Sequence, residues 1–352
     1  MSVETFGVQA GEETGIEFRL ATPADAEGIA QLYHDVYLGS YPLAECTDPA
    51  LVRRIVANDE HIWVLALDGD TVIGASVGRP EPGKDTYELC RAAVRHEYAG
   101  RGNFAVMFDM TVAAALARPD CELVYGYARS ERARQLFSRI SYRICWVGTD
   151  GGQHLFLGDR EEHLIGVSVN PLRTAKRVPP PRPIVLEDSV VYREMAEVRA
   201  ELVDGTYPDR IAPGGHADYL HESDYGTVAY SVFAPSRTAF VTDVTAAGAV
   251  AIRRVMWELL DGTAESPCPI EHVTLYVLAD KLDLIAELCR PEATDPKRRF
   301  AVRGYLPAWY KEGDARYDCV VLAARIDDRA TDRNGLESLV EGVYSSFPEE
   351  FR

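Results

Sequence analysis

The fold of this chain is decided by one stretch, residues 94–104, which reads VRHEYAGRGNF. It follows an apolar run at 87–94 and precedes a helical pattern at 105–116, so two glycines lie where a strand turns into a helix. Glycine has no Cβ, so the backbone can bend sharply there, while the free N–H groups and dipole of the helix start attract phosphate. The spacing predicts either an anion-binding loop or a tight turn without a ligand.

A family resemblance favours the anion-binding loop. Residues 97–102, EYAGRG, resemble the coenzyme A loop of the GCN5-related N-acetyltransferases (GNAT), which has the pattern Gln/Arg-x-x-Gly-x-Gly/Ala. Glu97 and Ala99 depart from that pattern, whereas both glycines are kept. Residues 130–142, SERARQLFSRISY, resemble a second motif of the same family, Asn-x-x-Ala-x-x-Leu-Tyr-x-x-x-Gly-Phe. The first half of the chain is therefore identified as a member of this family.

Composition limits the class of protein. The chain has 352 residues, enough for two domains, and its 47% hydrophobic and 26% charged residues are typical of a soluble globular protein. The formal net charge of −18, without a basic cluster, argues against nucleic acid as a partner. An acidic protein instead attracts cationic small molecules such as amines.

The cysteines and the N-terminal residues indicate the compartment. Seven cysteines, an odd number without a CxxC pair, mostly lie in apolar runs and read as reduced, buried thiols. Residues 1–15 are polar and acidic, and no stretch has the length of an apolar membrane span. We expect a cytoplasmic protein with no signal peptide and no membrane partner.

Hydrophobic periodicity predicts an α/β fold with a mixed sheet. The resemblance implies that this fold consists of two tandem acyl-CoA N-acyltransferase (GNAT) folds, of which the second has diverged. The expected parts are listed here in order: an N-terminal tail at 1–15, a GNAT domain with the coenzyme A loop at 16–170, a Pro-rich linker at 171–185, a degenerate GNAT-like domain at 186–328, and a C-terminal helix and tail at 329–352. In the second domain the loop at 245–248, TAAG, keeps one glycine and has no basic residue. A second coenzyme A site is therefore not expected.

The resemblance implies acetyl-CoA as the cofactor. The residues that it places on the cofactor are Val94, Glu97, Tyr98, Ala99, Gly100, Arg101, Gly102, Asn103, Phe104, Ser130 and Ala133. The side chain of Arg101 either contacts phosphate or points to solvent.

Catalysis of acetyl transfer requires a base for the amine and stabilisation of the leaving thiolate. Glu88, on the strand that leads into the loop, is the predicted base; the alternatives are a cross-strand ion pair or a solvent-facing side chain. The Tyr that donates the proton to the thiolate in many family members is replaced by Phe137. Ser130, Tyr142 or a water takes that role, or no acid is needed.

The acceptor site is expected on the first helix, at Tyr33, His34 and Tyr37, where the family binds its acceptor. For Tyr33 the alternative is a buried ring of an amphipathic helix. No metal site is expected: His216 and His221, with acidic neighbours, match no ligand spacing and read as a solvated loop.

Together these features predict an acetyl-CoA-dependent N-acetyltransferase that acts on the amine of a small molecule by direct transfer through a ternary complex, with the first domain catalytic. The alternatives are an acyltransferase for a protein-bound or carrier-bound amine, and a catalytically impaired coenzyme A-binding protein. The acceptor and the oligomeric state do not follow from the sequence.

Overall fold

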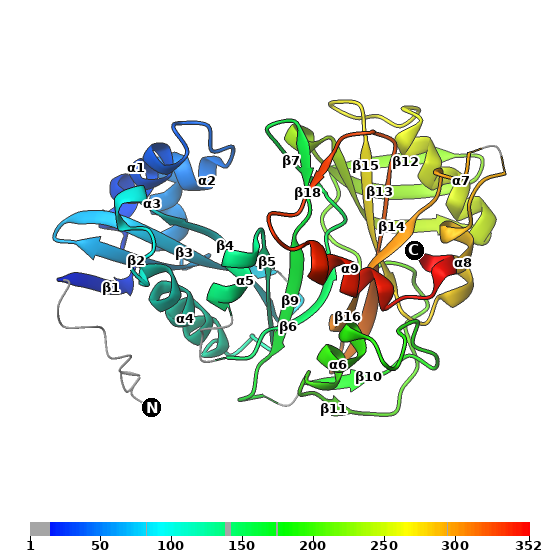
Figure 1. Cartoon of the computed structure of the whole chain (residues 1–352), viewed down its shortest axis with the longest axis horizontal. Helices are drawn as coiled ribbons and strands as arrows, with labels where there is room; N and C mark the ends of the chain where they lie inside the picture. Colours follow the sequence, from blue (N-terminus) through cyan, green and yellow to red (C-terminus); the bar gives the residue numbers. More distant parts are fainter. Residues whose placement is uncertain (1–14, 82, 138–141, 174, 294) are drawn as a thin grey trace. The chain divides into compact units, whose positions relative to one another are not determined.

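The computed structural model describes residues 15–352 except 82, 138–141, 174 and 294 (Figure 1). These residues form a mixed α/β structure of two compact units. The first unit comprises the residues up to Gly126 together with Gln135–Ile144, and the second comprises Tyr127–Arg134 together with Cys145–Arg352. No helix among the described residues combines the length and the apolar character that crossing a membrane requires.

The first unit contains, in chain order, β1 (Ile16–Leu20), α1 (Ala26–Val36), α2 (Ala44–Thr47), α3 (Pro49–Ala57), β2 (Ile62–Asp68), β3 (Thr71–Glu81), β4 (Thr86–Val94), the short 3-10 helix η2 (His96–Tyr98), α4 (Asn103–Leu116) and the start of β5 (Leu123–Ala128). Strands β1 to β4 pair antiparallel in sequence order, and β5 pairs parallel to β4. Hydrophobic periodicity predicts the order β-α-α-β-β-β-α-β for these residues, and the structure has this order apart from the short helix α2 and the short 3-10 helices.

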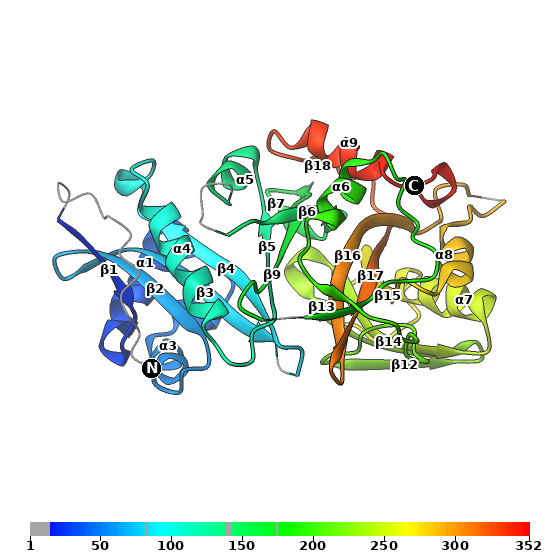
Figure 2. The same ribbon diagram turned by 90° about the horizontal axis from the view of Figure 1, so that it is seen from below.

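Helices cover both faces of this sheet. Successive side chains of a strand point to opposite faces, so neighbouring residues of β3 contact different helices. Ala75 and Val77 of β3 pack with α1 and α3, while Ser76 on the other face hydrogen-bonds Thr111 of α4 at 2.8 Å. A Cβ at Gly74 would lie 2.8 Å from the terminal methyl of Met107, so glycine allows α4 to approach β3 closely. Figure 1 shows the α1–α3 group on one side of β2 and β3 and α4 on the other, and Figure 2, seen from below, shows α4 in front of these strands.

A β-bulge interrupts β4 before the glycine loop. The register between β3 and β4 shifts between Ala75 and Val77, opposite Arg91, whose φ is 52°. The parallel pairing with β5 ends at Leu89 and Gly126, whereas β4 continues to Val94. After Leu89, therefore, the described ladder pairs no residue of β4 with β5.

The second unit contains β6 (Cys145–Thr149), β7 (His154–Phe156), β8 (Asp159–Glu161), β9 (Leu164–Val169), β10 (Lys176–Val178), α6 (Val190–Ala196), β11 (Glu201–Leu202), β12 (Tyr219–Ser223), β13 (Gly226–Phe233), β14 (Thr238–Ala246), α7 (Ala249–Leu260), β15 (His272–Leu278), α8 (Leu282–Cys289), β16 (Ala301–Glu312), β17 (Ala315–Arg325), β18 (Thr331–Asp332) and α9 (Glu337–Ser345). Helix α5 (Glu131–Phe137) has residues in both units.

The large sheet of the second unit has the strand order β9-β6-β16-β17-β15-β14-β13-β12. Strands β6 and β16 meet at Gly148 and Gly304, where a Cβ on either glycine would lie 2.7 Å from the Cα of the other. The parallel pairing of β14 with β15 ends at Val241 and Leu275, and β14 then bulges against β13 at Thr242. This repeats the sequence of features seen along β4.

The predicted linker at 171–185 contributes a strand. Lys176–Val178 forms β10, which pairs parallel with β17 and with β11. Arg177 donates two hydrogen bonds of 2.7 Å to Asp318, whose side chain is fully buried. Proline content indicated an extended segment correctly, but it did not indicate this partner.

Other boundaries differ from the sequence expectations. Apolar spacing predicts a helix at 190–203, but the helix in the structure ends at Ala196. It also predicts a strand that starts at Tyr142, whereas the strand begins at Cys145. The helix expected at 131–140 is described to Phe137, and its last expected residues lie outside the described part. The strands β6 to β9, assigned by sequence to the first domain, belong to the second compact unit, so the expected domain limits remain a prediction.

Candidate active site

The glycine loop connects β4 to α4 through eight residues, 95–102. Gly100 and Gly102 have φ values of 80° and 87°, a region that side chains other than glycine rarely adopt. Gly102 is the residue that caps α4. The two glycines are therefore required by the backbone of this turn.

Successive N–H groups of the loop are available to a ligand. Among the described residues, the backbone N–H groups of Gly100, Arg101, Gly102, Asn103 and Phe104 donate to no protein acceptor, and the first helical hydrogen bond runs from Ala105 to Gly102 at 3.0 Å. Such a run at a helix N-terminus is the arrangement that binds phosphate groups. The loop thus has the backbone donors that a phosphate group requires.

Side chains anchor both ends of the loop. Arg95, next to Val94, donates to a carboxylate oxygen of Asp35 at 2.5 Å and to the carbonyl of Val72 at 3.0 Å. The Tyr98 hydroxyl donates to Asp68 at 2.6 Å. The buried Asn103 amide donates to the Tyr98 carbonyl at 3.4 Å. Tyr98 and Asn103, predicted as cofactor residues, therefore also shape the loop.

The other predicted loop side chains take different positions. Glu97 and Ala99 are exposed. The Arg101 guanidinium lies over the Tyr98 ring, 5.4 Å from its centroid. Phe104 stacks on Phe108 of α4 at 5.5 Å. The loop therefore presents mainly backbone groups.

Polar side chains form a row across the sheet before the β4 bulge. Arg79 of β3 is registered opposite Glu88 of β4, which is registered beside Tyr125 of β5. His61 stands next to this row, since it precedes the residue paired with Gly78. Directly paired residues share a face, so these side chains lie on one face of the sheet.

Glu88 forms the cross-strand ion pair that was the alternative to its role as base. Both Nε and Nη2 of Arg79 donate to Oε2 of Glu88. The other carboxylate oxygen of Glu88, Oε1, has no hydrogen-bond donor among the described residues, and 14% of the Glu88 side chain is exposed. Arg79 therefore orients Glu88 and leaves one carboxylate oxygen available.

The bulge of β4 is held from the α1–α2 side. The Tyr33 hydroxyl donates to the carbonyl of Arg91, and the Arg91 side chain pairs with Glu45. Burial, together with the charge of Arg91, lowers the pKa of His61 to about 4. His61 is therefore a neutral imidazole at physiological pH.

The predicted acceptor residues divide into core and surface. Tyr33 is fully buried, with ring centroids of Tyr37 and Tyr41 at 6.3 and 5.0 Å, which supports its reading as a core residue. Tyr37 is half-buried in the same aromatic cluster. The His34 side chain is 66% exposed.

The predicted thiolate acids lie in different units. Ser130, in the second unit, accepts the N–H of Ala133 at 3.2 Å and so caps α5. Tyr142, in the first unit, is half-buried, and its pKa is raised by burial and by Asp109. Phe137 packs its ring on Phe108 at 4.4 Å and is a core residue.

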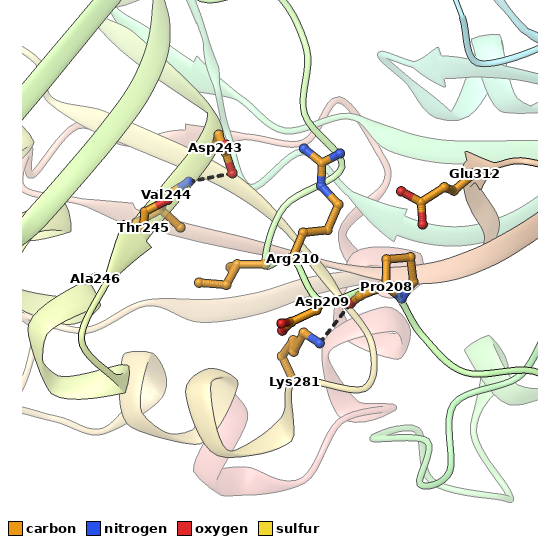
Figure 3. A pocket seen from close by; sticks show the side chains of 10 residues that line it. Pro208, Asp209, Arg210, Asp243, Val244, Thr245, Ala246, Lys281 and Glu312 are labelled. Atoms are coloured by element: carbon orange, nitrogen blue, oxygen red, sulfur yellow. Dashed lines mark hydrogen bonds between the residues drawn. The ribbon is translucent and has the colours of Figure 1, made fainter.

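The second unit has a pocket of about 700 Å³ at the end of β14 (Figure 3). Its lining residues are Pro208, Asp209, Arg210, Ile211, Asp243, Val244, Thr245, Ala246, Lys281 and Glu312. The Arg210 guanidinium donates to the Ala212 carbonyl and the Tyr310 hydroxyl, and it forms no ion pair among the described residues. Three carboxylates against two cations make this lining unsuited to a polyphosphate.

Sequence reasoning missed the partners of Glu88. Arg79 and Tyr125 are polar residues at alternating positions of predicted strands, which is the signal that could have selected them. Their convergence depends on the register, which a single sequence does not supply. His216 and His221 pair with Asp218 and Glu258, each at 2.8 Å.

No family model matches the chain, and no curated protein sequence matches it. Solved structures do match. An acetyltransferase of the GNAT family from Streptococcus pneumoniae is 14% identical, covers 44% of this chain and 99% of its own, and has a TM-score of 0.38. A spermidine N-acetyltransferase chimera that includes the Vibrio cholerae enzyme is 12% identical over 45% of this chain and 96% of its own, with a TM-score of 0.37.

NAA60 from Arabidopsis thaliana, in complex with acetyl-CoA, is 18% identical over 44% of this chain and 98% of its own, with a TM-score of 0.37. Over about 45% of its length the chain is similar in structure to GNAT acetyltransferases.

Proposed function

We propose that the protein is an acetyl-CoA-dependent N-acetyltransferase for the amine of a small molecule, with its reaction carried out in the first unit. The observation that supports this most is the run of five N–H groups from Gly100 to Phe104, in the loop that follows the bulged β4, which donate to no acceptor among the described residues. Acetyl-CoA would supply an activated acetyl thioester. The loop backbone would hold its phosphates.

Glu88 is the proposed base. Its free Oε1 accepts a proton from the acceptor ammonium, while Arg79 keeps the carboxylate in one orientation. The row around Glu88 also includes Glu81, which accepts the Tyr125 hydroxyl at 2.7 Å. A cationic amine is the acceptor class that these carboxylates favour.

Tyr142 is the proposed proton donor to the thiolate, since its phenol carries a proton at neutral pH and can donate it. Ser130 remains the alternative donor, although its hydroxyl oxygen already accepts a helix N–H. His34 and Tyr37 remain proposed contacts of the acceptor.

We also infer that the second unit contains a diverged copy of the same fold. Its β14, α7, β15, α8, β16 and β17 follow the order of β4, α4, β5, α5, β6 and β9. In both series a parallel pair is followed by a bulge and a helix. The pairing of the last two strands is antiparallel in both.

Calorimetric titration of acetyl-CoA into the wild-type protein and a Gly100→Glu variant tests the cofactor assignment. We expect one micromolar site per chain, weakened at least about 100-fold in the variant, or about 2.7 kcal/mol, because the added carboxylate meets the phosphates. Gly69→Glu is the matched control, because Gly69 also has a positive φ and open space at its Cβ position. Absence of wild-type binding would reject the proposal.

A coenzyme A-binding protein without turnover is the second candidate, favoured by the occupation of Glu88 Oε2 by Arg79. An acceptor screen with amines, monitored by release of free thiol, separates the two. Turnover with any amine above the hydrolysis rate excludes the second candidate, and binding without turnover supports it.

A further inference from the structure

Three side chains of the second unit converge outside the sites described above. Asp150 follows β6, His154 begins β7 and His163 precedes β9. One ligand atom from each residue lies within 4.8 Å of the others. Gly151 and Gly152, with φ values of 68° and 80°, turn the chain back so that Asp150 and His154 come together.

Asp150 has a carboxylate oxygen without a donor. The side chain is fully buried, and its Oδ1 accepts the backbone N–H groups of Gly152 and His163, both at 3.0 Å. Its Oδ2 lies 3.2 Å from Nδ1 of His163 and 4.0 Å from Nε2 of His154, but it makes no hydrogen bond with any described residue. A buried carboxylate oxygen is costly unless a donor or a cation approaches it, so Oδ2 of Asp150 is suited to serve as a ligand atom.

His163 is oriented as a metal ligand would be. Its Nε2 lies 3.1 Å from Oε2 of Glu161, and Glu161 is itself fixed by the Arg129 guanidinium. A proton on Nε2, donated to Glu161, leaves the lone pair of Nδ1 facing Oδ2 of Asp150. A carboxylate behind a histidine in this way is the usual outer partner of a metal-bound imidazole.

His154 completes the set. Its ring stacks on that of His163 with a centroid distance of 5.0 Å, and its Nε2 lies 3.1 Å from the side-chain amide nitrogen of Gln153. That amide donates, so Nε2 of His154 is unprotonated, and a bound metal ion would take the place of this donor at its lone pair. The His154 side chain is 35% exposed, which opens one side of the cluster to solvent.

We propose that Asp150, His154 and His163 bind a divalent transition-metal ion, for which Zn²⁺ is the best match. Two imidazoles and one carboxylate are a Zn²⁺ donor set, whereas Ca²⁺ and Mg²⁺ prefer oxygen ligands. Donor separations of 3.2 and 4.0 Å suit an ion with bonds of about 2.0–2.2 Å. The fourth position, on the exposed side, takes a water.

The ion would fasten three segments of the second unit. Its ligands come from the end of β6, the start of β7 and the residue before β9. The small sheet of β7, β8 and β18 is joined to the large sheet through these turns. Metal binding therefore adds stability to this region by mass action, since the unfolded chain does not hold the three ligands together.

The test uses full-length, tag-free protein treated with a chelator and then titrated with ZnCl₂ by calorimetry. We expect one Zn²⁺ per chain and a higher melting temperature with Zn²⁺. In His154→Ala, binding should weaken at least about 100-fold and the shift in melting temperature should disappear. His216→Ala, which removes an exposed histidine of the same unit, should bind like the wild type.

Circular dichroism checks that each variant is folded, and Asp150→Asn provides a second ligand change of nearly equal shape. Substitution by Co²⁺ should give visible absorption bands in the wild type that both ligand variants lose. No saturable Zn²⁺ binding, or equal binding in His154→Ala, would overturn the proposal.

Discussion

The connection from β4 to α4 and the connection from β14 to α7 follow similar strands and differ in their loops. Both follow a strand that bulges soon after its last parallel pair, Leu89 with Gly126 in one case and Val241 with Leu275 in the other. The first loop has eight residues between β4 and α4, whereas the second has two, Ala247 and Gly248. The N–H groups of residues 247–251 also donate to no acceptor among the described residues, so the two connections differ in the length of backbone before the helix and not in free N–H groups.

The two units also differ in the residue that comes just before the last parallel pair of the strand. In the first unit Glu88 lies between Arg79 and Tyr125; in the second, Phe240 holds the corresponding position between Ser231 and Thr274. A carboxylate with a guanidinium partner is thus replaced by an aromatic ring. The comparison teaches that a similar order of strands and helix can carry a carboxylate–guanidinium pair at this position in one unit and an aromatic ring in the other.

The largest effect is expected at Glu88. Replacement by Gln removes the proposed base, so kcat should fall by about 10²–10⁴-fold while acetyl-CoA binding stays unchanged. Steady-state kinetics and calorimetry measure the two quantities. Glu27→Gln, at an exposed carboxylate of α1, is the control. An unchanged kcat in the Gln variant would remove the contrast between Glu88 and Phe240.

A smaller loss is expected for the partner of Glu88. Arg79→Ala should lower kcat by about tenfold with a smaller change in KM, because the carboxylate loses its orientation. Arg79→Lys should restore part of the rate. Arg53→Ala, which breaks an exposed ion pair with Glu27, should leave kcat unchanged. A loss of folded protein in Arg79→Ala without rescue by Lys would indicate a structural role instead.

Variants of Tyr142 and Ser130 should distinguish a role in proton transfer from a role in capping α5. Tyr142→Phe is expected to lower kcat by up to about tenfold, since a thiolate leaves without strong assistance from an acid. Ser130→Ala should keep kcat and lower the free energy of unfolding by about 1 kcal/mol, because α5 loses its cap. Kinetics and urea denaturation of both variants distinguish the roles. A rate loss confined to Ser130→Ala would reverse the assignment.

The smallest effect is expected at the second loop. Gly248→Glu places an acidic side chain in open space before α7 and should leave the affinity for acetyl-CoA within about twofold. The stoichiometry should remain one per chain. Two sites in the wild type, one of them lost in Gly248→Glu, would show that both connections bind the cofactor.

The fold was predictable where local patterns decide it. The strand, glycine loop and helix from Thr86 to Leu116 were placed almost correctly, because apolar periodicity and two adjacent glycines define their limits. The linker was a harder case, since prolines are equally typical of a connecting segment and of a short edge strand. Arg177 and Asp318 are 141 positions apart, and their contact has no local signal.

The candidate site shows the same limit. Glu88 was selected from its place before the loop, but its pairing with Arg79 depends on strand register. Asp150 and His163 lie in irregular backbone and His154 begins the three-residue strand β7, so their spacing matches neither a helical nor a hairpin ligand motif. Residues that act together across a sheet are found by sequence only when the register is already known.

The contact of Gly148 with Gly304 has a consequence for cutting the chain. Strand β6 precedes the proline-rich segment and β16 follows it, yet their backbones meet too closely for any side chain. A fragment that ended near residue 170 would leave the β6 edge of this joint unpaired, and the remaining fragment would expose the matching edge of β16. We therefore expect the two pieces to reassemble when mixed, and each to aggregate when kept apart.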